Sequence, residues 1–170
     1  MGHLGYARVT AIDRFENARR RAQLIHFWER LTNRPKRLLP FATIHSALFY
    51  PSGVHQGIRE IPVRQIQGSL AQAPEFDRDF RPLHKNQRER WANVWVLHVQ
   101  KGWEPIVVHK IDGIYFVEDG HHRISVARDF GLETIEASVT AYPGSIVLNP
   151  TASLDDILVS LEAAFPALTG

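Results

Sequence analysis

The sequence predicts an α+β protein in which a small mixed sheet packs with helices. Apolar, β-branched residues fill the ranges 106–111 and 114–117, and the pair Asp112-Gly113 between them is typical of a two-residue hairpin turn. Apolar residues recur at three- and four-residue steps in the ranges 11–31 and 121–130, which predicts amphipathic helices. The chain has 170 residues, 44% of them hydrophobic, and is long enough to bury a core of its own.

The N-terminal residues 1–56 are predicted to form a helical, basic extension. Its long helix spans residues 11–31 and ends before Asn33 and Pro35, which break the helical pattern. A second, short helix is expected around residues 41–49. The residues from Pro51 to Gly53 indicate a turn that leads into the core.

The core, residues 57–145, is predicted to begin with a strand over residues 58–66. Proline cannot donate a hydrogen bond to a neighbouring strand, so Pro62 favours an edge position. An irregular polar segment follows, and then a helix over residues 86–99 that Gly102 ends. We expect the two tryptophans of this helix, Trp91 and Trp95, to be core residues rather than a platform for base stacking.

The second half of the core has the clearest pattern. The hairpin of residues 106–117 leads through Gly120 into a helix over residues 121–130, with Gly131 as its C-cap. A strand is predicted over residues 134–141. Residues 146–170 are predicted to hold a C-terminal helix that packs on the core. Its start resembles a capping box, and its inward residues are Leu154, Ile157, Leu158, Leu161 and Phe165.

The composition excludes several classes of protein. The sequence has no cysteine, which excludes disulfides, thiolate metal ligands and a cysteine nucleophile. No segment approaches the ~20 apolar residues that a membrane span needs, and the N-terminus lacks the apolar stretch of a signal peptide. We therefore expect a soluble, cytoplasmic protein with no membrane partner.

Positive charge is concentrated near the N-terminus. Residues 8–37 hold nine arginines or lysines and three acids, a local charge of +6 against +2 for the whole chain. A basic arm can attract polyanions, which makes Arg19, Arg20 and Arg21 candidate contacts to DNA. The alternative is an ordinary solvated helix face.

The segment from Glu118 to Arg123 carries the chemistry. A strand ends, a glycine permits a sharp turn, and a helix begins whose first N–H groups have no partner within the helix. Together with the helix dipole these groups make an anion site, and Arg123 can bind phosphate oxygens with its planar guanidinium. A phosphate would satisfy the N–H groups, neutralise Arg123 and raise the pKa of His121 and His122. The alternative is that Asp119 only caps the helix.

A protein-made metal cage is a weaker interpretation. Adjacent histidines on a helix point ~100° apart, so His121 and His122 chelate one ion poorly. No pair of histidines with the favourable four-residue spacing occurs here.

Several segments resemble the ParB N-terminal domain family, which shares its fold with sulfiredoxin and with a ParB-like free-serine kinase. The resemblance covers about residues 57–142, and its most specific stretch is Asp119-Gly-His-His-Arg123. It implies that Gly120, His121, His122 and Arg123 contact nucleotide phosphates and that Asp119 lies near a metal or the transferred group. The implied cofactors are a nucleotide (ATP, ADP or CTP) and Mg²⁺ bound through it.

The departures from the family narrow what the resemblance implies. Sulfiredoxin needs a cysteine within this motif, and this chain has none, so that reductase activity is excluded. About 30 residues follow the core, too few for the helix-turn-helix domain of partition proteins. The kinase-type Asp-Gly-His-x-Arg pattern is the closer match, and Glu60, Glu75 and Glu118 are all candidates for its catalytic glutamate.

Other polar residues are auxiliary candidates. The loop over residues 75–81 could supply a magnesium-binding carboxylate and a phosphate-binding arginine, Arg78 or Arg81, and the alternative is a solvated loop. Ser125 supports the turn or faces solvent.

Three functions remain open on this basis. The first is a nucleotide-binding enzyme or switch, a phosphotransferase or hydrolase in which Asp119 and Glu118 are the candidate catalytic residues. The second is a DNA-binding or nuclease-type protein that uses the basic arm. The third is an interaction module whose apolar terminal helices form a homodimer.

Overall fold

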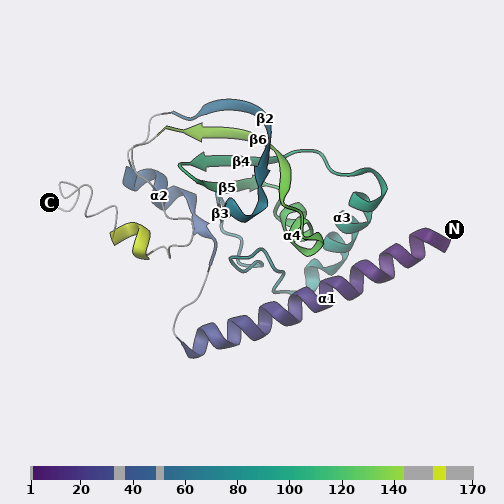
Figure 1. Cartoon of the computed structure of the whole chain (residues 1–170). Coiled ribbons are helices and arrows are strands. Elements are labelled where there is room, and N and C mark those ends of the chain that lie inside the picture. The colour runs from purple at the N-terminus through teal and green to yellow at the C-terminus, as the bar shows by residue number, and fades with distance from the viewer. Residues whose placement is uncertain (1, 33–36, 49–51, 144–154, 160–170) are drawn as a thin grey trace.

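The computed structural model describes residues 2–32, 37–48, 52–143 and 155–159. Its centre is a mixed six-stranded sheet with the strand order β1-β3-β5-β4-β6-β2 (Figure 1). The strands are β1 (Leu39–Pro40), β2 (Val54–Pro62), β3 (Ile66–Ser69), β4 (Ile106–Ile111), β5 (Ile114–Asp119) and β6 (Thr134–Tyr142). The helices are α1 (Gly2–Leu31), α2 (Phe41–Leu48), α3 (Arg88–Lys101) and α4 (His121–Phe130). The predicted class, a mixed sheet packed with helices behind a helical N-terminus, is confirmed.

The predicted hairpin forms the centre of the sheet. Strands β4 and β5 pair antiparallel, and Ile111 faces Ile114 across a turn in which Asp112 has a φ of 52°. Parallel pairing then adds β3 to β5 and β6 to β4, so both hairpin strands are interior. Strand β2 pairs antiparallel with β6 and is an edge strand, as Pro62 predicts.

One predicted strand is in fact two. The prediction of a single strand over residues 58–66 is wrong, because the chain leaves β2 at Pro62, makes a 3-10 turn (Val63–Gln65) and re-enters as β3. The backbone N–H of Val63 donates to the carbonyl of Glu133 at 2.9 Å, which fixes this crossing. Strands β2 and β3 therefore lie in different halves of the same sheet.

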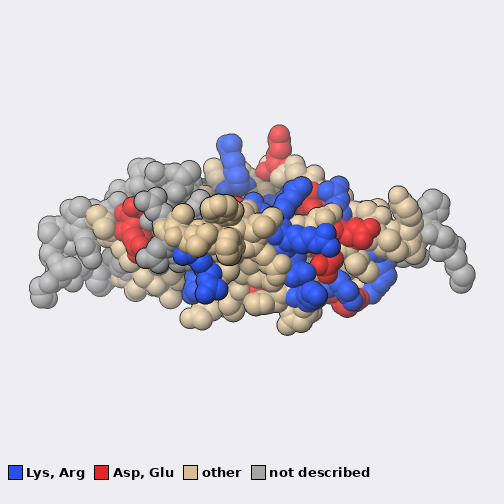
Figure 2. All heavy atoms as spheres, turned by 90° about the horizontal axis from the view of Figure 1, so that it is seen from below, with Lys and Arg blue, Asp and Glu red and all other residues tan. Residues whose placement is uncertain are grey.

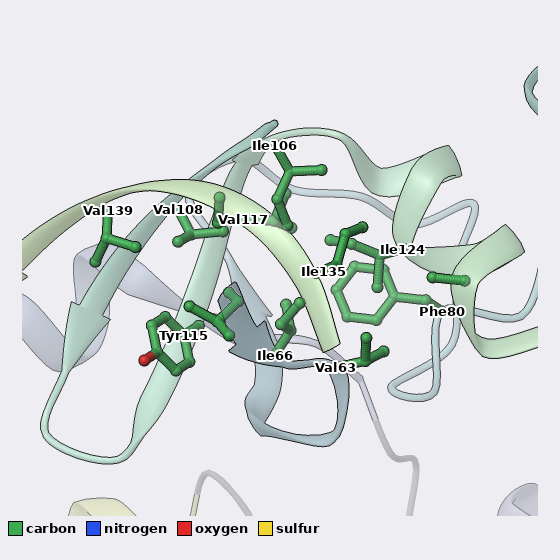
Figure 3. Packing of buried hydrophobic residues seen from close by; sticks show 13 residues of the cluster. Val63, Ile66, Phe80, Ile106, Val108, Tyr115, Val117, Ile124, Ile135 and Val139 are labelled. Atoms are coloured by element: carbon green, nitrogen blue, oxygen red, sulfur yellow. The ribbon is translucent and has the colours of Figure 1, made fainter. Parts of the chain in front are cut away.

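One face of the sheet is covered by α4 and the loop that holds Phe80 (Figure 3). Ile106 and Val117 from the hairpin pack there against Ile124 of α4, and all three are fully buried. This packing fixes where α4 begins, because the helix follows β5 after a single residue.

The other face is covered by α2 and by the short helix over residues 155–159. Leu39, Ile44 and Ile157 cluster there with Ile114 and Phe116. Strand β1 and helix α2 therefore belong to the packed body, while the division of the chain at residues 56 and 145 stays a prediction. Of the predicted C-terminal helix, Leu154, Leu161 and Phe165 lie outside the described residues.

Helix α1 runs along the outside of the molecule, with α3 and α4 between it and the sheet (Figure 1). Ala11 and Phe15 are fully buried against Trp91 of α3, and the rings of Phe15 and Trp91 meet edge to face at 5.8 Å. The helix begins at Gly2, earlier than predicted, which adds more than two turns at its N-terminal end. In the described residues, no helix combines the length and the apolar character that a membrane crossing requires.

Candidate anion-binding site

The strand β5, the residue Gly120 and the helix α4 build a sharp corner. Gly120 is the N-cap of α4 with a φ of 116°, which L side chains rarely adopt. A Cβ atom at this position would collide with the side chain of Ile106. No side chain caps α4, so the suggested capping role of Asp119 is wrong, and the first N–H groups of the helix stay open to a ligand.

A small pocket of about 140 Å³ opens at this corner. Three separate segments line it: the loop after β3, helix α3, and the β5–α4 corner. The lining residues are Glu75, Phe76, Arg90, Val94, Asp119, Gly120, His121, His122 and Arg123. The structure thus brings the five predicted residues Asp119 to Arg123 together with four that come from elsewhere in the chain.

His121 is held on two sides. Its Nε2 atom hydrogen-bonds with the hydroxyl of Ser69 at 2.8 Å, and its ring stacks on Phe76 with centroids 6.0 Å apart. Burial lowers the pKa of His121, and the guanidinium of Arg90 lowers it further, while Glu75 and Asp119 act in the opposite direction. A neutral imidazole with a fixed orientation results.

His122 is the more perturbed of the two histidines. Its Nε2 atom is buried without a hydrogen-bond partner in the described structure, and its ring meets Phe76 edge to face at 5.1 Å. Burial, followed by the positive charge of Arg90 and then His121, lowers the pKa of His122 to about 4. An anion beside this ring would reverse the electrostatic part of the shift.

The guanidinium of Arg123, which the sequence suggests is available to a phosphate, is bound to other residues of the chain. One guanidinium nitrogen donates to the carbonyls of Glu104 and Pro105 at 2.8 and 3.0 Å, and the other pairs with Asp119. The side chain therefore ties the first turn of α4 to the segment before β4. It lines the pocket, but a phosphate would compete with these three acceptors.

Arg90 is the residue that sequence analysis missed. It lies exposed on α3, lines the pocket and forms no ion pair with any residue that the structure describes. Its neighbour Trp91 donates its indole N–H to the hydroxyl of Ser125 at 2.9 Å, which fixes α3 against α4. The sequence offers no local signal for Arg90, since 31 positions separate it from His121 and only helix packing brings them together.

The remaining predicted acids and Ser125 lie at different places. Glu75 lines the pocket, whereas Glu118 points to the other face of β5 and contacts His109 at 2.7 Å. Glu60 is exposed on β2 opposite Glu136 of β6. Ser125 is buried as the acceptor for Trp91, so it does not face the pocket.

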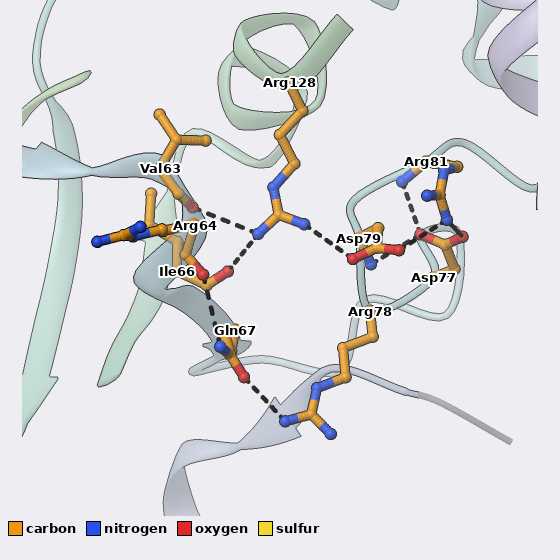
Figure 4. Close-up of polar contacts among 9 residues, drawn as sticks. All are labelled: Val63, Arg64, Ile66, Gln67, Asp77, Arg78, Asp79, Arg81 and Arg128. Carbon is orange, nitrogen blue, oxygen red and sulfur yellow. Dashed lines mark hydrogen bonds and ion pairs between the residues drawn. The ribbon is translucent and has the colours of Figure 1, made fainter. Parts of the chain in front are cut away.

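Arg78 and Arg81 line a different cavity. It is a cleft of about 970 Å³ between α1, the β2–β3 crossing and the loop after β3. There Arg128 donates to the carbonyls of Val63 and Ile66 at 3.3 and 2.7 Å and pairs with Asp79 at 3.3 Å (Figure 4). Arg81 pairs with Asp77 at 3.1 Å and with Asp79 at 2.8 Å, and Arg78 donates to Gln67 at 2.9 Å. The predicted loop of residues 75–81 thus divides, with Glu75 at the pocket and its arginines at the cleft.

The candidate DNA contacts lie on α1. Arg19 is half-buried and pairs with Glu16 at 3.0 Å, while Arg20 and Arg21 are exposed. Figure 2, seen from the α1 side, has most basic side chains gathered at the middle of this face, with acidic ones among them. Within the described ranges, no group of three or more histidine or acidic side chains is placed to hold a metal ion.

The fold and the pocket define a mixed α/β protein with a small pocket where a central strand meets the N-terminus of a helix. No family model matches the chain, and no curated protein matches it. Among solved structures it is similar to a sulfiredoxin from Arabidopsis thaliana, with 26% identity and a TM-score of 0.36, over 48% of this chain and 82% of that one.

A second similar structure is the C-terminally truncated chromosome-partitioning protein ParB from Caulobacter crescentus, complexed with CTP-gamma-S. The identity is 23% and the TM-score 0.30, over 61% of this chain and 52% of that one. The match therefore spans about half of the ParB chain. Both kinds of protein have the fold that the resemblance in the sequence implies.

Proposed function

We propose that this chain binds a phosphate-bearing nucleotide at the N-terminus of α4. The observation that carries the proposal is Arg90, an exposed guanidinium without an ion pair in the described structure, which shares a pocket with two neutral histidines. The positive charge of Arg90 is not neutralised by the two histidines, which resist protonation. A bound anion would neutralise it. The first turn of α4, whose N–H groups have no partner within the helix, lines the same pocket.

The pocket volume sets which part of a nucleotide enters. About 140 Å³ is small compared with the ~300–1,000 Å³ of sites that enclose a whole small ligand. The phosphate end therefore enters the pocket, and the base and sugar lie outside it. Arg90 contacts the phosphate from α3, and Arg123 lines the same pocket with its guanidinium tied to Asp119.

Magnesium fits the oxygen donors present. Glu75 and Asp119 both line the pocket, and carboxylates together with phosphate oxygens are the ligands that Mg²⁺ prefers. Bound there, the ion would offset the negative charge of the phosphates. Glu75 is then the candidate among the three glutamates for assisting phosphoryl transfer or hydrolysis, because Glu60 and Glu118 do not line the pocket.

The test of binding is a thermal-shift series on the full chain. Phosphate, pyrophosphate, ADP, ATP and CTP are each added with and without Mg²⁺; CTP is included because the similar ParB structure holds a CTP analogue. A ligand at about 100 times its dissociation constant should stabilise the protein by roughly 2.7 kcal/mol. A panel in which no compound raises the melting temperature would end the proposal.

Two variants on the same helix locate the site. Arg90→Ala should weaken binding about 10- to 100-fold, since a hydrogen bond to a charged group contributes about 1.5–3 kcal/mol. Arg88→Ala is the matched control, because Arg88 is exposed on α3, contacts Glu89 at 3.4 Å and does not line the pocket. Equal affinities in the two variants would place the ligand elsewhere.

Turnover is measured separately as phosphate release from the nucleotide that binds. Glu75→Gln should lose release and retain binding of the nucleotide measured without Mg²⁺, since the amide keeps the shape but cannot accept a proton. Unchanged release in this variant would remove Glu75 from catalysis without affecting the binding proposal.

DNA binding through α1 is the alternative function. Arg20 and Arg21 are exposed side by side on this helix, whereas Arg19 is occupied by Glu16. Binding through phosphates should weaken steeply as salt is raised, and replacing Arg20 and Arg21 by glutamine should reduce that slope. An affinity for DNA that the double variant leaves intact would exclude this surface.

A further inference from the structure

Helix α1 exposes large apolar side chains on the face turned away from the body. Tyr6 is 77% exposed, Leu24 and Trp28 are 64% exposed, and Phe27 is 60% exposed. Val9 and Leu31 are also exposed. Exposed apolar patches of this kind are typical of an interaction surface.

Four of these six apolar residues, Tyr6, Leu24, Phe27 and Leu31, lie on two series with a seven-residue spacing. Tyr6, Asp13, Arg20 and Phe27 are spaced by seven, and Thr10, Asn17, Leu24 and Leu31 form a second series with the same spacing. Seven residues are nearly two full turns of an α-helix, so both series lie along one stripe. The stripe is opposite the docked face, where Ala11, Phe15 and Ala22 are fully buried.

Apolar and charged side chains lie along the stripe in a fixed order. Apolar side chains occupy both ends, and the charged pair Asp13 and Arg20 lies between them. Both charged side chains are exposed, and neither forms an ion pair among the residues that the structure describes.

We propose that the stripe binds the same stripe of a second copy of this chain, with the two α1 helices antiparallel. A two-fold axis between Glu16 and Asn17 would pass through the midpoint of the helix Gly2–Leu31, so the two helices overlap along their whole length. Tyr6 then meets the partner's Phe27, and Val9 meets the partner's Leu24. Asp13 faces the partner's Arg20, and the reverse pair forms on the other side of the axis.

The small residues fit the same arrangement. Trp28 would lie against the partner's Gly5, and a side chain added at Gly5 would meet nothing within 4 Å in one chain. A parallel pair would instead place Asp13 on Asp13 and Arg20 on Arg20, which is repulsive at both positions. The self-complementary pattern therefore selects the antiparallel orientation and a second copy as the occupant.

The decisive test exchanges the two charges. Arg20→Asp and Asp13→Arg each place like charges across the axis, so each single variant should sediment with the mass of one chain. The double variant Asp13→Arg/Arg20→Asp restores opposite charges and should recover the mass of two chains. Arg30→Asp changes a charge beside the stripe and should leave the dimer intact.

Sedimentation equilibrium across a wide concentration range measures these masses. A wild-type chain that stays monomeric at every concentration overturns the proposal, and so does a dimer that neither single charge reversal affects. All three substitutions replace exposed side chains, and an unchanged circular dichroism spectrum checks the folding of each variant.

Because the chain has no cysteine, a single introduced thiol can report the orientation. Asn17→Cys lies beside the axis and should form a disulfide between two copies under mild oxidation. Thr10→Cys would be roughly 20 Å from its own copy in the antiparallel pair, given ~1.5 Å of rise per residue, and should not cross-link. Equal cross-linking of both variants would indicate a parallel pair and overturn the proposed orientation.

Discussion

Two cavities flank the loop after β3, and both are lined by arginines and acids. They differ in whether the arginines are paired with other residues of the chain. In the larger cleft, Arg128 and Arg81 each contact acceptors of the protein itself. In the smaller pocket, Arg90 forms no ion pair with the described residues, and the adjacent histidines are neutral. A basic cleft is therefore not by itself a ligand site. What favours the smaller pocket as the proposed site is an arginine without an ion pair beside two neutral histidines, a combination that Arg64 in the cleft lacks.

Removing Arg128 should have the largest effect on stability. Arg128→Met leaves the carbonyls of Val63 and Ile66 without their donor, so we expect a loss on the order of 3 kcal/mol in the free energy of unfolding. Urea denaturation measures it, and nucleotide affinity should not change. Arg64→Met is the control at the same cleft, because Arg64 is exposed, and its effect should be within about 0.5 kcal/mol. Similar losses in both variants would contradict the structural role of Arg128.

Gly120→Ala should destabilise the protein by a smaller amount, about 2 kcal/mol. The φ of 116° is strained for alanine, and the added methyl group collides with Ile106. Gly113→Ala, in the hairpin turn, is the matched control because nothing lies within 4 Å of its Cβ position. If the Gly120 variant is as stable as this control and still binds nucleotide, the corner is not the constraint that we describe.

The smallest of the three expected effects is the change of ligand affinity with pH. His122 has a pKa of about 4 and is neutral at pH 7. A bound anion favours the charged imidazole, so its pKa is higher in the complex, and affinity should rise as pH falls from 7. The rise should end near pH 4, where the free protein also carries the proton.

Calorimetry of pyrophosphate binding in two buffers of different ionisation enthalpy measures the proton uptake directly. His122→Asn should remove the part of the uptake that this ring carries, while Arg90 still provides its charge. Binding without proton uptake in the wild-type protein would place the anion away from the histidines.

The local patterns of the sequence predict much of the fold. The turn at Asp112, the corner at Gly120 and the helix stop at Gly131 are each set by a few adjacent residues, and the structure confirms them. The break between β2 and β3 was missed, because nothing near Pro62 indicates that the backbone of Val63 will bond to Glu133. A hydrogen bond between segments so far apart has no local signal.

The residues of the candidate site also fall into those that the sequence predicts and those that it does not. The contiguous run from Asp119 to Arg123 could be found from its residue types, and all five residues line the pocket. Arg90 could not be found, because its position depends on how α3 packs on α4. The hydrogen bonds from Arg123 to the carbonyls of Glu104 and Pro105 were missed for a related reason. Every residue has a backbone carbonyl, so residue types do not indicate which one accepts a hydrogen bond.

The uninterrupted order of β4, β5 and α4 has a consequence for how the protein folds. These three elements span residues 106–130, are joined by short loops and contact one another. In contrast, the pairings β2–β6 and α1–α3 join segments that are distant in the sequence. Local contacts close with little loss of chain entropy and tend to form early, so we expect this unit to nucleate folding. The backbone corner of the pocket would then exist before Arg90 arrives on α3, and affinity for phosphate would appear only in the late phase of folding.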